Sequence, residues 1–150
     1  MKKVITIIFA LLLFVAGCAE NNVVVPEGCE NSLIYAEAAK LGVTPQAVGT
    51  IFQLANLELL KNNVIAKADV EQFFDDVECL LDRDETTYLD VVAMVVTRVD
   101  ELRNEYGPEV MVLITAFSEQ LSKPIPIDEC DRMLMLKHVA DQRKILDMIN

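Results

Sequence analysis

The chain contains a single histidine, His138, and a carboxylate follows it one helical turn later at Asp141. This spacing places both side chains on one helix face, as in a proton-transfer pair. A zinc site needs three or four ligands, and the sequence has neither a second histidine nor a Cys-x-x-Cys motif. We therefore expect His138 to be a surface or boundary residue beside a local carboxylate, and we expect no metal site.

The acidic residues from 75 to 85 could in principle bind calcium, because Asp82 and Asp84 are spaced like the first ligands of a calcium loop. Position six of that loop is Thr87, where glycine is required, and position twelve is Ala93, where glutamate is required. A solvated acidic face is the better interpretation. The sequence also lacks a G-x-S-x-G motif and a glycine-rich phosphate loop, so we expect no catalytic residues and no cofactor.

The first 17 residues have the composition of a secretory signal peptide. Lys2 and Lys3 are followed by 14 uncharged, almost entirely apolar residues, from Val4 to Gly17. As a helix these would rise about 21 Å, which is short of the roughly 30 Å hydrocarbon core of a membrane. The segment therefore indicates export rather than a spanning anchor.

The end of this segment, Val15, Ala16, Gly17 and Cys18, resembles the lipobox of bacterial lipoproteins, in which small residues precede an obligatory cysteine. The resemblance covers about the first 20 residues, and Val15 stands where the family prefers leucine. It implies cleavage after Gly17 and acylation of Cys18, so that acyl chains would hold the protein at a membrane. Ala19 stands where aspartate favours inner-membrane retention in Gram-negative lipoproteins, which implies the periplasmic face of the outer membrane in such a host. The alternative is ordinary secretion, with cleavage after Gly17 or Ala19.

These features divide the chain into three parts: a signal peptide at 1–17, a lipidated N-terminus and tether at 18–29, and one helical domain at 30–150. Removing the first 17 residues leaves 11 basic and 24 acidic residues, a formal charge of −13. Such a charge argues against binding to nucleic acid, which needs a basic face. The remaining apolar content is ordinary for a globular domain.

Beyond the tether, apolar residues recur with a helical period, and stop signals separate the periodic stretches. We expect an all-α fold, a compact bundle or orthogonal array of about six helices. The expected helices cover residues 30–41, 45–61, 67–81, 88–106, 108–121 and 129–149.

Several residues predict how these helices begin and cross. Thr44 and Asp128 are typical N-caps, and Thr87 with Asp90 forms a shortened capping box. Gly49 lowers helix stability within its segment, so we expect a close helix crossing there.

Three cysteines remain after lipidation of Cys18, and an exported protein can keep them oxidised. Cys29 and Cys130 each lie near the start of a helix, whereas Cys79 lies within one. Because helix starts adjust more readily to disulfide geometry, we predict a Cys29–Cys130 disulfide, with Cys29–Cys79 as the rival pairing.

The sequence contains no signal for a specific activity. The leading hypothesis is a lipid-anchored, non-enzymatic module of the cell envelope that binds or helps to assemble another protein. The alternatives are a binding protein for a small apolar ligand or lipid held between helices, and an enzyme whose only chemistry would be that of its acids.

The last helix has apolar residues on more than one face, so part of it is a candidate surface for the protein partner. Methionine suits such surfaces because its side chain repacks easily. The candidate residues are Met133, Met135, Val139, Leu146 and Met148.

Overall fold

The computed structural model describes residues 23–101, 104–105 and 108–149. Within these residues it contains six α-helices, and the only β pairing is an isolated bridge between Thr87 and Pro126. The all-α prediction is confirmed. None of the described helices is long and apolar enough to cross a membrane. The helices are α2 (Leu33–Lys40), α3 (Pro45–Lys61), α4 (Lys67–Leu81), α5 (Tyr88–Glu101), α6 (Pro108–Leu121) and α7 (Glu129–Met148).

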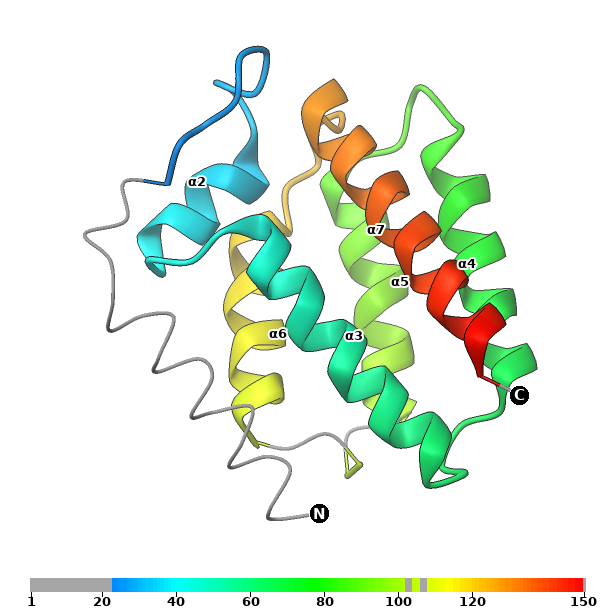
Figure 1. The fold of residues 1–150 in the computed structure, drawn as a ribbon. Coiled ribbons are helices and arrows are strands. Elements are labelled where there is room, and N and C mark those ends of the chain that lie inside the picture. Colours follow the sequence, from blue (N-terminus) through cyan, green and yellow to red (C-terminus); the bar gives the residue numbers. More distant parts are fainter. Residues whose placement is uncertain (1–22, 102–103, 106–107, 150) are drawn as a thin grey trace.

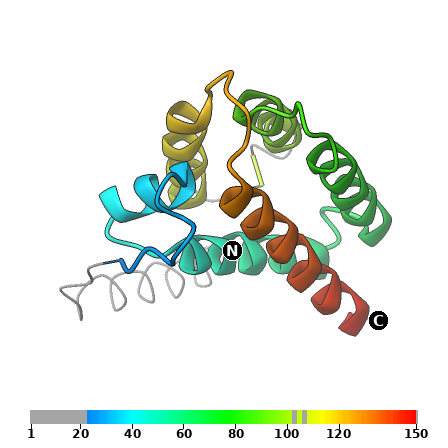
Figure 2. The same cartoon turned by 90° about the horizontal axis from the view of Figure 1, so that it is seen from above.

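The helices form two halves, which lie on opposite sides of the domain (Figures 1 and 2). In the tether half, α2, α3 and α6 pack against one another beside the described part of the tether, residues 23–29. In the acidic half, α4 packs along α7. Because α5 contacts both α4 and α6, it joins the two halves.

The largest apolar cluster is centred on α4 and α7 and includes Phe74, Leu81, Val139 and, from α3, Leu59, all at most 4% exposed. Two smaller clusters stabilise the tether half. One surrounds Ala38 between α2 and α3, and the other joins α3, α5 and α6. The tether half therefore has two clusters of its own, whereas the largest cluster extends across both halves.

The predicted helix starts are confirmed by hydrogen bonds. The Thr44 side chain accepts a hydrogen bond from the Ala47 amide, and the Asp128 side chain accepts one from the Cys130 amide. The Thr87 amide donates to Asp90 Oδ2 at 2.8 Å, while the Asp90 amide donates to Thr87 Oγ1 at 3.3 Å. This reciprocal pair is a capping box, and the hydrogen bonds that the Thr87 amide and then the Thr87 hydroxyl donate to the Asp90 carboxylate lower the pKa of Asp90.

Two predicted helix limits were too generous. The first helix begins at Leu33 rather than at residue 30, because Ser32 is the N-cap and its side chain accepts from the Tyr35 amide. Within the described residues α5 ends at Glu101, and residues 104–105 form a turn. The predicted end at Tyr106 and stop at Gly107 lie outside the described residues.

The close crossing expected at Gly49 is confirmed. A β-carbon added at this position would lie 2.8 Å from His138 Nδ1 and 3.1 Å from His138 Cε1. The absence of a side chain on α3 therefore makes room for the imidazole ring of α7.

Candidate functional site

The predicted disulfide is present: Cys29 at the end of the tether is bonded to Cys130 in the first turn of α7, with the Cα atoms 5.3 Å apart. Cys79, the rival partner, is free and exposed on α4. The bond joins residues 101 positions apart. As a result, the tether is attached covalently to the last helix as well as to α2.

Next to the disulfide, a buried carboxylate binds the starts of three helices together. Asp131 has no exposed surface. Its carboxylate accepts hydrogen bonds from the Ser32 hydroxyl and, at 2.9 and 3.3 Å, from the Leu33 and Ile34 amides. These amides belong to the first turn of α2, which otherwise lacks acidic residues. Asp131 therefore supplies the negative charge that a helix N-terminus favours.

Tyr88 completes this arrangement from the start of α5. Its hydroxyl donates to Asp131 Oδ2 at 2.6 Å and accepts from the Asp128 amide at 3.1 Å. Burial, and then the hydrogen bond to Asp131, raises the pKa of Tyr88, so the phenol stays protonated and continues to donate. We call Cys29, Ser32, Tyr88, Cys130 and Asp131 the anchor junction.

Sequence reasoning found the disulfide but missed the role of Asp131. The residue belongs to an acidic first turn, as many helix starts do, and nothing local distinguishes it from its neighbours. Its partners lie 97 to 99 residues away for the α2 contacts. Only the folded arrangement brings these groups together.

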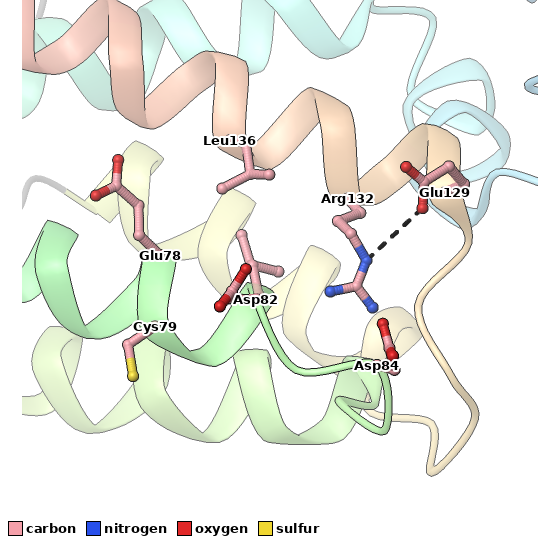
Figure 3. A pocket seen from close by; sticks show the side chains of 8 residues that line it. Glu78, Cys79, Asp82, Asp84, Glu129, Arg132 and Leu136 are labelled. Carbon is pink, nitrogen blue, oxygen red and sulfur yellow. Dashed lines mark ion pairs between the residues drawn. The ribbon is translucent and has the colours of Figure 1, made fainter.

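A cleft of about 570 Å³ lies between α4 and α7, and three of the acidic residues between positions 75 and 85 line it (Figure 3). Arg132 reaches into it from α7, with Nε 3.9 Å from Glu129 and Nη1 donating to the Arg83 carbonyl at 3.2 Å. Figure 3 shows Cys79 pointing away from α7. Among the described residues, no group of three potential ligands is placed to hold a metal ion. The residues that line the cleft are Glu78, Cys79, Leu81, Asp82, Asp84, Glu129, Arg132 and Leu136.

His138 is a boundary residue, as predicted, but Asp141 is not its hydrogen-bond partner. Asp141 accepts instead from Lys137 at 2.6 Å and Lys144 at 3.2 Å, which lowers its pKa. His138 Nε2 lies 3.2 Å from Nε2 of the buried Gln142. Burial is the main cause of the lowered pKa of His138.

The predicted partner surface on α7 requires a correction. Val139 and Leu146 are 4% and 3% exposed and belong to the core. They are seven positions apart, which is about two helical turns, so both lie on the inward-facing side of the helix. Met135 is half-buried against the same core. Met133 and Met148 are exposed, so for these two residues a partner contact stays a prediction.

The predicted lipidation site at Cys18 and the cleavage motif Val15, Ala16 and Gly17 lie outside the described residues. In comparisons with known proteins, no family model matches the chain, and neither a curated protein nor a solved structure matches it.

Proposed function

We propose that this chain is a lipoprotein of the bacterial cell envelope, in which acyl chains on Cys18 hold a non-enzymatic interaction or assembly module at a membrane. The observation that carries the proposal is the Cys29–Cys130 disulfide, eleven residues after the lipobox cysteine. Disulfides persist in the oxidising compartments that exported proteins reach. A signal peptide, a lipidated cysteine and a nearby structural disulfide are therefore mutually consistent.

Substitution of the lipobox cysteine tests the anchor. Cys18→Ala should abolish incorporation of labelled palmitate and leave an unprocessed precursor, whereas Cys79→Ala, which alters the exposed free thiol, should change neither. Intact-mass analysis measures both the acylation of the protein and the cleavage of its precursor. A wild-type protein with an unmodified mature N-terminus would refute the lipoprotein proposal.

The target membrane follows from the residue after the cysteine. In a host with two membranes, Ala19 supports sorting to the periplasmic face of the outer membrane. Ala19→Asp should shift the acylated protein to the inner-membrane fraction of a density gradient, and Ala19→Ser should not. If the wild type already fractionates with the inner membrane, this part of the proposal is wrong.

The cleft between α4 and α7 supports a protein partner over a small apolar ligand. Five of its lining residues are ionisable acids or arginine, namely Glu78, Asp82, Asp84, Glu129 and Arg132, and such a surface suits the polar contacts of a protein interface. Native mass spectrometry of the protein extracted from its own membrane separates the two hypotheses, because a retained lipid and a retained protein differ in mass.

Charge reversal in the cleft makes this measurement specific. Asp82→Lys combined with Asp84→Lys should release a protein bound there, whereas Glu71→Lys combined with Asp76→Lys changes the same charge outside the residues that line the cleft. Retention of every co-purifying protein by both variants would exclude the cleft as the interaction site.

A further inference from the structure

We infer that the Cys29–Cys130 disulfide is a redox latch: a partner protein with an exposed dithiol attacks the sulfur of Cys29, and reduction of the bond allows the tether and α2 to detach from α7. The disulfide joins the last residue of the tether to the first turn of α7. The inference goes beyond the proposed function, because it concerns the state of the anchor junction and does not require acylation of Cys18.

The two bonded cysteines differ in their access to solvent. Cys130 is 5% exposed in the first turn of α7. Cys29 is partly exposed, and residues 24–28, which precede it in a loop at the outer end of the domain, are all exposed (Figure 1). In thiol–disulfide exchange an incoming thiolate must reach one of the two sulfurs, so access determines which sulfur is attacked. The attack should therefore fall on Cys29.

The exchange transfers two electrons from the partner to the domain. The partner's thiolate forms a bond with Cys29 Sγ, the original disulfide breaks, and Cys130 leaves as a thiolate that takes a proton from water. The partner's second thiolate then attacks the mixed disulfide, and Cys29 leaves in the same way. The domain ends with two thiols, and the dithiol of the partner is oxidised to a disulfide.

Reduction weakens the attachment of α2, because this helix cannot stand alone. It has eight residues, and isolated helices of that length are unstable in water. The disulfide and the start of α3 at Pro45 hold both ends of the segment that contains α2. Opening one end of a segment of about 15 residues should favour its detached state by about 100-fold in the chain-entropy model.

The remaining contacts of α2 are local, so its detachment can leave the other helices in place. Asp131 holds its first turn through the Leu33 and Ile34 amides, and Ala38 packs in a small cluster with Val43. By contrast, α4 packs along α7. Local opening of this kind follows the boundaries of packed units. The reduced protein would then expose the apolar cluster around Ala38, which the oxidised protein buries.

A trapping experiment identifies the sulfur that is attacked. Cys18→Ser combined with Cys79→Ser leaves only the two sulfurs of the anchor junction, and the full chain is kept in detergent. The probe is a thioredoxin variant whose second active-site cysteine is replaced by serine, so that the reaction stops at the mixed disulfide. Non-reducing peptide mapping then shows which cysteine of the domain is linked to the probe.

We expect at least about tenfold more probe linked to Cys29 than to Cys130, because the second residue is buried. Equal linkage, or linkage mainly to Cys130, would overturn the inference. So would the absence of any mixed disulfide with a probe that captures oxidised glutathione under the same conditions. None of these outcomes depends on acylation, so the lipoprotein proposal and this inference can fail separately.

Hydrogen exchange followed by mass spectrometry tests the consequence of reduction. When the protein is reduced by a phosphine, deuterium uptake at short labelling times should at least double in α2, whereas α4 should stay protected. The same reductant should change nothing in the variant with Cys29→Ser and Cys130→Ser, which has no bond to reduce. Unchanged protection of α2 on reduction of the wild type, or an equal loss of protection in α4, would show that the disulfide is not a latch.

Discussion

The tether half and the acidic half of the domain are stabilised by different interactions. At the anchor junction, the tether half is joined to α7 by a disulfide and by a fully buried carboxylate that accepts hydrogen bonds from two segments of the chain. In the acidic half, Arg143 of α7 pairs with Asp75 at 2.6 Å and Glu78 at 3.0 Å on α4, all partly exposed. Buried polar networks are costly to break, whereas exposed ion pairs contribute little. The two halves should therefore respond very differently to loss of one polar group.

The largest loss of stability should come from removing the disulfide. Replacing both Cys29 and Cys130 by serine should lower the free energy of unfolding by about 4–5 kcal/mol, because the bond closes a loop of about 100 residues. Denaturant titration measures the change, and Cys79→Ser is the matched control with no expected effect. A loss below about 1 kcal/mol would show that the junction does not depend on the disulfide.

Substitution of the buried carboxylate tests the polar part of the junction. Asp131→Asn keeps the shape but turns an amide donor toward groups that donate to the carboxylate, such as the Leu33 amide. We expect a loss of about 3 kcal/mol in unfolding free energy. Arg143→Ala, the counterpart in the acidic half, should cost less than about 1 kcal/mol. Equal losses would remove the contrast between the two halves.

The crossing of α3 and α7 connects the halves at a second point. Gly49→Ala would bring a methyl group to 2.8 Å from His138 Nδ1, and overpacking of this kind costs about 1–3 kcal/mol. Alanine regains about 1 kcal/mol of helix propensity, so the net loss should be about 1 kcal/mol. In a His138→Ala background the same substitution should become stabilising, and a double-mutant cycle measures that coupling.

The smallest effect should be the pH dependence of stability at the same crossing. Burial lowers the pKa of His138, an effect that Lys137 increases and Asp141 opposes, and α3 has no ionisable side chain between residues 45 and 57. The unfolded chain therefore takes up the proton first, below its ordinary pKa of about 6.5. The free energy of unfolding should fall as the pH drops below that value and level off below the folded pKa.

Denaturant titrations of the wild type and His138→Gln across this range isolate the effect, since most carboxylates titrate at lower pH. The substituted protein should show a flatter profile. Identical profiles would mean that His138 takes up its proton equally in the folded and unfolded states.

Local signals predicted most of the helices, because caps and stops act over only a few residues. Thr44, Thr87 with Asp90, and Asp128 begin their helices as the sequence indicates. Gly49 also indicated the close crossing of two helices. Glycine lowers helix stability, so its position within a helix suggested that close packing requires a residue without a side chain.

The sequence predicted the residues of the candidate site less completely than it predicted the helices. The cysteines could be paired from their positions at helix starts, but the contacts of Asp131 depend on segments almost 100 residues away. The apolar residues of α7 surround the helix too evenly to show which of them face inward. Val139 and Leu146 were therefore assigned to a surface although they are core residues.

The disulfide also determines what proteolysis can release. Residues 29 to 130 form one covalently closed loop, so a single cut anywhere within that loop leaves both products joined through sulfur. If Cys18 carries the proposed acyl chains, neither product could leave the membrane until the bond was reduced or the short tether itself was cut. A protease that nicks this domain would thus damage it without shedding it.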